Sequence, residues 1–293
     1  MPYFEKITRS GRLLEVERYF ATRDGRRIAR GENRAESSEE MERLNERNAR
    51  RKLMRLINAN FSGAAGDLFV TLTHAQPVDE AQAAKEERNV LLRIARARER
   101  KGLDALKYIA ITECQSGRWH HHLIINGGLT LDELRAVWGT RGRLMVSTLD
   151  DTYTYEELAR YLTSGHKPRR GAEGAENAKT PRRKGARRWH ASRNLTRPVE
   201  TKRQIARPPK PGEPKARKGY RLLPDWYVGC DRLGYVYSYA AYVAEQLPGG
   251  RRAASRTARA AAGAAALPLS CMSQGWRKRH GKPRDAIMGR ESE

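Results

Sequence analysis

Cysteine is scarce in this sequence, and its spacing excludes two classes of small, cross-linked domain. The chain of 293 residues has three cysteines, Cys114, Cys230 and Cys271, which lie far apart and form no C-x-x-C pair. A zinc ribbon and a disulfide framework both need cysteines paired at short spacings. Neither is therefore expected, and a reducing, intracellular setting fits the sequence.

Long apolar runs are also missing. No run approaches the roughly 20 residues that a membrane-spanning helix needs. No G-x-x-x-x-G-K-[ST] sequence occurs, so a built-in nucleotide-driven motor is not expected. Hydrophobic residues make up 39% of the chain and charged residues 31%, so a core of ordinary size can form from only part of it.

Positive charge is what the sequence has in excess. It holds 58 lysines and arginines against 34 aspartates and glutamates, a formal net charge of +24. Such a surplus points to a polyanionic partner, because neutralised phosphates release their condensed counterions. The alternative, a basic protein on a membrane surface, would need an amphipathic helix with bulky apolar anchors. We find no such helix beyond those a core would use, so no membrane partner is expected.

The hydrophobic pattern predicts an α+β protein. After a hairpin at 3–20 and a charged helix at 35–60, the expected elements are strand 67–74, helix 79–101, strands 107–115 and 119–126, a helix from Thr130, strand 143–149 and a helix from Thr154 to about Thr163. Both later helices begin with a capping-box pattern. The order β-α-β-β-α-β predicts a ferredoxin-like, split β-α-β antiparallel sheet. We expect helices on one face, the other face free for a site, and basic extensions.

Composition divides the chain into three predicted parts. Residues 1–59 hold the hairpin and the charged helix, and residues 60–200 hold the ferredoxin-like domain. Residues 201–293 read as a basic linker, a short β-like segment and a disordered tail rich in alanine and arginine.

Three of the seven histidines stand side by side in RWHHHLIIN, at the start of a predicted strand. Alternate side chains of a strand point to opposite faces, so His120 and His122 share the open face and His121 packs toward the core. Imidazoles at this spacing suit one divalent ion, with Glu113 of the preceding strand as the candidate third ligand and Mn²⁺ or Mg²⁺ as the metal. The alternative is that these histidines are only polar residues at an exposed strand start.

With these motifs the chain resembles the HUH endonucleases, specifically rolling-circle replication initiators of the filamentous-phage and small-plasmid type. His120-His121-His122 matches their His-hydrophobic-His motif, with histidine in the middle position. Phe69-Val-Thr-Leu-Thr73 looks like their earlier strand motif, and Glu113 matches their acidic ligand. The resemblance covers roughly residues 60–200.

The family's nucleophile is a tyrosine on a later helix, often within Y-x-x-K, and Tyr161 matches it best. Ser164 stands where the family has lysine, and Lys167 is the next ammonium group. The neighbouring Tyr153 and Tyr155 are rival nucleophiles. Tyr161 has an alternative role as a core aromatic that packs with Leu158 and Leu162.

The resemblance implies a metal-dependent DNA endonuclease. Tyr161 would attack a phosphodiester of single-stranded DNA at a replication origin, leaving a 5′-phosphotyrosine and a free 3′-OH. A host helicase and polymerase would be partners, and the cytoplasm of a bacterial host the location. The alternatives are a conjugative relaxase, a single-tyrosine transposase, or a non-enzymatic nucleic-acid-binding protein on a ferredoxin-like sheet. Such binding sheets use exposed aromatics on central strands, and here the open face offers only Phe69.

The basic segments around residues 167–188 and 193–221 are expected to contact the DNA backbone, although they would also fit solvated charge runs. Trp189 and His190 are candidates for stacking on unpaired bases. The candidate DNA-binding residues are Lys167, Arg169, Arg170, Arg188, Trp189 and Arg193.

Overall fold

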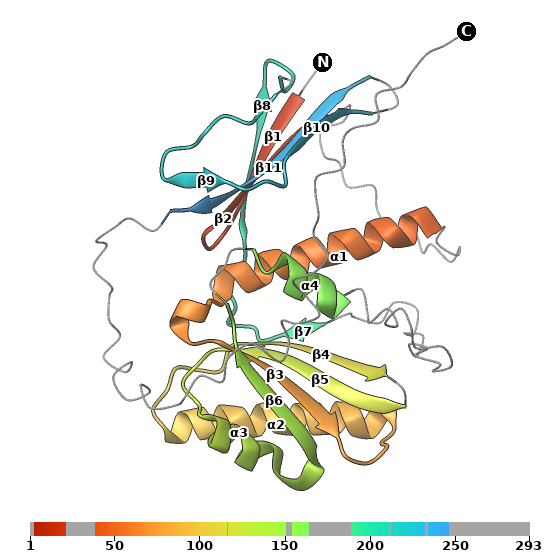
Figure 1. Cartoon of the computed structure of the whole chain (residues 1–293), viewed down its shortest axis with the longest axis vertical. Coiled ribbons are helices and arrows are strands. Elements are labelled where there is room, and N and C mark those ends of the chain that lie inside the picture. The colour runs from red at the N-terminus through yellow and green to blue at the C-terminus, as the bar shows by residue number, and fades with distance from the viewer. Residues whose placement is uncertain are drawn as a thin grey trace. The chain divides into compact units, whose positions relative to one another are not determined.

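Two antiparallel sheets organise the part of the chain that the structure describes (Figure 1). The structure is a computed structural model, and it describes residues 3–21, 39–115, 117–150, 154–163, 189–210, 212–231 and 234–245. No helix among these residues is both long and apolar enough to cross a membrane.

The five-stranded sheet has the order β6-β3-β5-β4-β7. Its strands are β3 (Leu68–His74), β4 (Tyr108–Gln115), β5 (Arg118–Ile125), β6 (Gly142–Thr148) and β7 (His190–Ala191). Helix α2 (Glu80–Arg100) connects β3 to β4, and α3 (Leu131–Trp138) connects β5 to β6. The α+β class is confirmed, and this connectivity with this strand order is the split β-α-β arrangement of ferredoxin-like folds.

Local sequence signals explain where the helices begin. The Asp79 side chain accepts a hydrogen bond from the backbone N–H of Gln82 and starts α2. At α3, Thr130 and Glu133 form the predicted reciprocal capping box. At α4 (Glu156–Thr163), the Thr154 hydroxyl accepts from the backbone N–H of Glu156 at 3.4 Å. These caps satisfy backbone donors that have no partner inside the helix.

Helices cover both faces of the five-stranded sheet, so the expectation of helices on one face is wrong. On one face, apolar side chains of the strands pack against α2 and α3; the buried set is Leu68, Val70, Leu72, Val90, Leu91, Ile94, Leu123, Ile125, Leu134 and Trp138. On the other face, α1 (Glu39–Asn60) and α4 cover part of the sheet (Figure 1). The buried residues there include Leu53, Ile57, Ile109, Ile111, Ile124 and Leu162.

The six-stranded sheet joins segments that lie far apart in the sequence. It has the order β10-β11-β2-β1-β8, with β9 paired to β11. The strands are β1 (Tyr3–Ser10), β2 (Leu13–Phe20), β8 (Val199–Ile205), β9 (Tyr220–Leu222), β10 (Tyr227–Cys230) and β11 (Val236–Ala244). The predicted hairpin at 3–20 is confirmed. The three-part division of the chain stays a prediction, but β8 lies in a segment expected to be part of a basic run or linker.

Gly11 in the β1–β2 turn is required by two constraints. Its φ of +56° lies in the left-handed region, where a side chain is unfavourable. An added Cβ would also come within 2.1 Å of the Asn58 carbonyl oxygen of α1. The turn is therefore seated directly against that helix.

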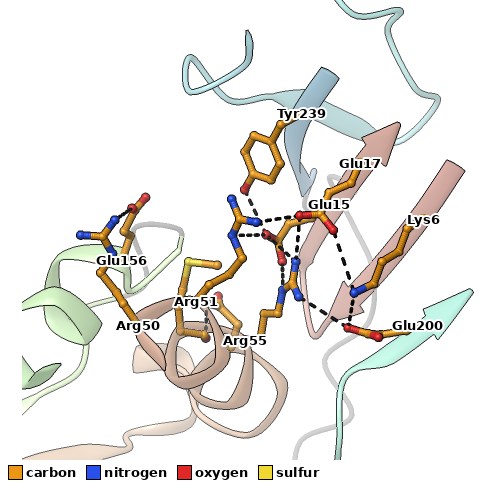
Figure 2. Close-up of polar contacts among 11 residues, drawn as sticks. Lys6, Glu15, Glu17, Arg50, Arg51, Arg55, Glu156, Glu200 and Tyr239 are labelled. Atoms are coloured by element: carbon orange, nitrogen blue, oxygen red, sulfur yellow. Dashed lines mark hydrogen bonds and ion pairs between the residues drawn. The ribbon is translucent and has the colours of Figure 1, made fainter. Parts of the chain in front are cut away.

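A buried ion pair fastens α1 to the six-stranded sheet (Figure 2). The Arg55 guanidinium donates to both carboxylate oxygens of Glu15, with an Nη2–Oε1 distance of 3.1 Å. Glu15 is fully buried and also accepts from the Tyr239 hydroxyl at 3.0 Å. Arg51 donates to Glu17 at 2.7 Å beside them. Buried charges of this kind need such paired, hydrogen-bonded surroundings.

His121 points to the α2/α3 face, as the strand alternation predicts, and it is fully buried. It is more than a packing residue, because both ring nitrogens have polar partners. Nδ1 lies 2.7 Å from the Thr112 hydroxyl, and Nε2 lies 2.9 Å from Nε2 of His74. Burial, followed by the repulsion of His74 and the flanking histidines, lowers the pKa of His121 from 6.5 to about 3.

Removing one partner of the buried ion pair should strongly destabilise the fold. We expect Arg55→Met to lower the free energy of unfolding by about 3–5 kcal/mol, because the buried Glu15 carboxylate loses the guanidinium that donates to both of its oxygens and keeps only the Tyr239 hydroxyl and Arg51 at 4.0 Å. Urea denaturation followed by circular dichroism measures this change. The control is Arg135→Met, which breaks the exposed Asp132–Arg135 pair and should cost less than about 1 kcal/mol. Equal effects of the two substitutions would contradict the assignment.

The low pKa of His121 predicts an acid-sensitive core. Because its folded pKa lies below the unfolded value, its stabilising contribution is complete above pH 6.5 and is lost as the pH falls toward 3. Each pH unit in that window should cost about 1.4 kcal/mol for this proton. Denaturation curves in EDTA between pH 7 and pH 5 should therefore show a shallower pH dependence for His121→Leu than for the unsubstituted protein. Parallel slopes would show that His121 does not titrate in this way.

Candidate active site

The register of β5 between its two neighbours gathers polar residues on the α1/α4 face of the five-stranded sheet. His122 is paired with Thr71, and His120 is paired with Thr73 of β3. On the opposite side, His120 is paired with Glu113 of β4. Directly paired residues of antiparallel strands share a face, so these five side chains lie together. Of the predicted site residues, the structure thus places Glu113, His120 and His122 in one cluster.

The two threonines fix how the histidine rings lie. The Thr71 hydroxyl lies 3.2 Å from His122 Nδ1, and the Thr73 hydroxyl lies 3.0 Å from His120 Nδ1. The two imidazoles are nearly parallel, at 10°, with centroids 6.5 Å apart. With Nδ1 occupied in both rings, Nε2 is the nitrogen that each ring would present to a ligand. This is the usual support for metal-binding histidine, whose second nitrogen is held by a polar group.

Glu113 and His122 are already at the spacing of two ligands of one ion. Glu113 Oε1 lies 3.1 Å from His122 Nε2. Adjacent ligands of an octahedral ion, each about 2.1 Å from it, lie about 3 Å apart. Oxygen and imidazole donors suit Mn²⁺ or Mg²⁺. However, no group of three or more histidine, cysteine, aspartate or glutamate side chains in the described part of the chain has a metal-holding arrangement. Two of the three predicted ligands therefore fit, and His120 would have to move to join them.

Helix α4 brings Tyr161 onto the same cluster. Its ring contacts His122 edge to face, with centroids 5.7 Å apart, and Phe69 at 6.4 Å. The side chain remains 37% exposed, whereas Leu162 of the same helix is buried in the core and Leu158 is packed against it. Tyr161 therefore faces the histidines, which disfavours the alternative of a purely core aromatic. Burial and, after it, the Glu113 carboxylate raise the pKa of Tyr161.

The rival tyrosines differ in position. The Tyr155 hydroxyl donates to the Asp150 carbonyl oxygen at 2.7 Å, and its ring packs against the core. Its φ of +50° is unusual for a residue with a side chain and marks the tight entry into α4. Tyr153 lies outside the described residues.

Most of the predicted DNA-binding residues also lie outside the described residues, namely Lys167, Arg169, Arg170 and Arg188; Ser164 does too. Arg193 is exposed. Trp189 is half-buried against the core cluster that contains Ile109 and Ile111, so only part of its ring remains for stacking on a base. The DNA-contact role of these residues stays a prediction.

Sequence reasoning missed the contacts of Thr71 and Thr73 with the imidazoles. The register between β3 and β5 decides those contacts, and single-strand alternation does not reveal it. Arg143 of β6 was also missed. It is paired with Thr73, lies on the same face, and is exposed.

Comparison with known proteins identifies the domain that carries this cluster. Residues 67–166 match the family model of replication-associated protein ORF2/G2P. No curated protein and no solved structure gives a significant match. The matched segment begins just before β3 and contains Glu113, His120, His122 and Tyr161. Residues 67–166 are therefore similar to the replication-associated protein ORF2/G2P family, as the resemblance of the motifs implies.

Proposed function

We propose that this chain initiates rolling-circle replication by nicking single-stranded origin DNA with Tyr161 as the nucleophile. The family match supports the broader role of a replication initiator. The observation that carries the finer proposal is the contact of the Tyr161 ring with His122, which is itself hydrogen-bonded to Glu113. A phenol beside an imidazole–carboxylate pair is an arrangement suited to covalent phosphodiester chemistry.

In the proposed reaction, the Tyr161 oxygen forms a bond to the scissile phosphorus as the bond to the 3′ oxygen breaks. The net reaction moves the phenol proton to the leaving 3′ oxygen and leaves a 5′-phosphotyrosine. A Mn²⁺ or Mg²⁺ ion held by Glu113, His120 and His122 would supply Lewis-acid stabilisation of the phosphate charge. The free 3′-OH would prime a host polymerase, and a host helicase would separate the strands.

The protein's own residues prepare this step. Burial and the Glu113 charge keep the Tyr161 phenol protonated at rest, because both raise its pKa. Once the Glu113 charge is neutralised, it no longer raises the pKa of Tyr161, which favours the nucleophilic phenolate. The threonines hold both imidazoles through Nδ1, which leaves Nε2 as the nitrogen for the ion, and His120 would move to join Glu113 and His122. Arg143, on the same face, is placed to contact a phosphate that flanks the scissile one.

Tyr161→Phe should abolish the covalent adduct with single-stranded origin DNA in the presence of Mn²⁺. We expect nicking to fall by at least about a thousandfold, since the nucleophile is lost while packing on Phe69 and His122 is kept. Denaturing gel electrophoresis of labelled DNA detects both the nick and the adduct. The matched control, Tyr155→Phe, should retain adduct formation. If Tyr161→Phe still forms the adduct, another residue is the nucleophile.

The paired substitution Thr71→Val/Thr73→Val should weaken Mn²⁺ binding by about 10–100-fold, because the imidazoles lose the hydroxyls that orient them. Titration of the DNA-free protein by electron paramagnetic resonance measures the affinity without relying on nicking. Thr71→Ser/Thr73→Ser keeps the hydroxyls and should restore most of the affinity. Thr148→Val, on the exposed edge of the same sheet, serves as the control. Unchanged Mn²⁺ affinity in the double valine variant would refute this support role.

A further inference from the structure

The six-stranded sheet lies outside the family match and has no part in the proposed nicking chemistry. One of its faces is covered, because Leu14, Val16, Ala240 and Tyr242 pack there with Ile7, Tyr220, Leu222 and Trp226. The other face packs on α1 at one end, through Leu13 and Val243. Further along that second face, aromatic side chains replace the aliphatic ones.

Strand register places five aromatic rings on this face. Phe4 is paired with Tyr19 across β1 and β2. Tyr239 of β11 is paired with Glu17 of β2 and with Tyr227 of β10. Because side chains two residues apart in a strand share a face, Tyr237 and Tyr19 lie on the same side as Tyr239 and Glu17. We call Phe4, Tyr19, Tyr227, Tyr237 and Tyr239 the aromatic face.

The rings of the aromatic face form two groups, Phe4 with Tyr19 at a centroid distance of 6.4 Å and Tyr227 with Tyr237 and Tyr239. Tyr227 is stacked on Tyr239, with centroids 5.4 Å apart at 23°, and meets Tyr237 edge to face at 6.0 Å. Tyr227 is 47% exposed and Tyr237 39%. Gly229 lies beneath the Tyr237 ring, since an added Cβ would come within 2.8 Å of it. Glycine at this position thus lets the ring lie across β10.

Cations accompany these rings. The Lys202 ammonium lies 4.0 Å from the centroid of Phe4 and 5.7 Å from that of Tyr19. The Arg51 guanidinium lies 4.9 Å from the Tyr239 centroid (Figure 2). Three glutamates share the face, but Glu15 is paired with Arg55, Glu17 with Arg51 and Glu200 with Lys6. Residues 197–222, which include β8 and β9, hold nine lysines and arginines and two glutamates, a net charge of +7.

We propose that the aromatic face is a second binding site, for single-stranded DNA, in which unpaired bases stack on Tyr227 and Tyr237. Exposed rings on a sheet offer stacking surfaces to bases of any sequence, and neighbouring cations neutralise the phosphates. A duplex hides its base faces, so it would gain only the electrostatic part. We name DNA rather than RNA because of the proposed function. We name a single strand rather than a duplex because only unpaired bases can stack on the exposed rings.

The test measures binding of the full chain to a fluorescent oligothymidine of about 30 nucleotides, long enough for such a platform. Fluorescence anisotropy is read in EDTA, so that nicking does not contribute. Tyr227→Ala/Tyr237→Ala should weaken binding by about 10–100-fold, because two stacking surfaces for bases are lost together. Affinity for a duplex of the same length should change by less than about threefold, since its bases do not reach the rings. Tyr227→Phe/Tyr237→Phe keeps the rings and should bind as tightly as the unsubstituted protein.

The matched control is Val199→Ala, which removes an exposed apolar side chain from the face of the same sheet that lies opposite the aromatic face. It should leave the affinities for oligothymidine and for the duplex unchanged.

The proposal is overturned if the double alanine variant binds oligothymidine as tightly as the unsubstituted protein, which is the result expected of a face that binds a protein. It is also overturned if the affinity for the duplex falls in parallel. Loss of nicking in Tyr161→Phe with intact oligothymidine binding separates the two proposals. If the unsubstituted chain binds oligothymidine through these tyrosines but does not nick origin DNA, the proposed function is wrong and the binding site on the aromatic face is supported.

Discussion

The alternation of side chains along β5 is the constraint on which the candidate site depends. β5 is hydrogen-bonded on both sides, to β3 and to β4, so its register is fixed twice. A shift by one residue would turn His120 and His122 toward the α2/α3 core and His121 toward the α1/α4 face. Leu123, Ile124 and Ile125 fill the cores on both faces, so the contacts of the histidines decide between the two registers. His121 lies between Thr112 and His74 in the α2/α3 core, and the shift would break both contacts.

Much of this arrangement follows from sequence, for identifiable reasons. The 2-residue and 3.6-residue periods locate strands and helices, and Asp79 and Thr130 mark helix starts. The same alternation places His120 and His122 on one face of the sheet and His121 on the other. The second helical layer, by contrast, could not be predicted, because α1 and α4 meet the sheet only through contacts distant in sequence. β8 escaped detection because an exposed edge strand such as VETKRQI lacks the hydrophobic alternation that identifies strands.

The two sheets use buried polar groups in different ways. In the six-stranded sheet, Glu15, Arg55 and Tyr239 come from three elements and meet in one charged, hydrogen-bonded cluster (Figure 2). In the five-stranded sheet, Thr112, His121 and His74 form a neutral chain behind the candidate site. A charged cluster resists separation of its elements, since a lone buried charge is very unfavourable. A neutral chain instead keeps the strand beneath the site in a single conformation without placing charge there.

The pairing of β1 with β8 has a consequence for the order of folding during synthesis. Tyr3 is paired with Ile205, whereas β3 through β6 are all encoded between residues 68 and 148. A sheet built from nearby segments closes small loops and forms early, while one built from distant segments waits for the whole intervening chain. The β1–β2 hairpin thus leaves the ribosome before β3 to β6 and acquires its flanking strands after them. Until then its two open edges are exposed to pairing with other chains, and the lysine and arginine residues on and around these strands oppose such pairing by charge repulsion.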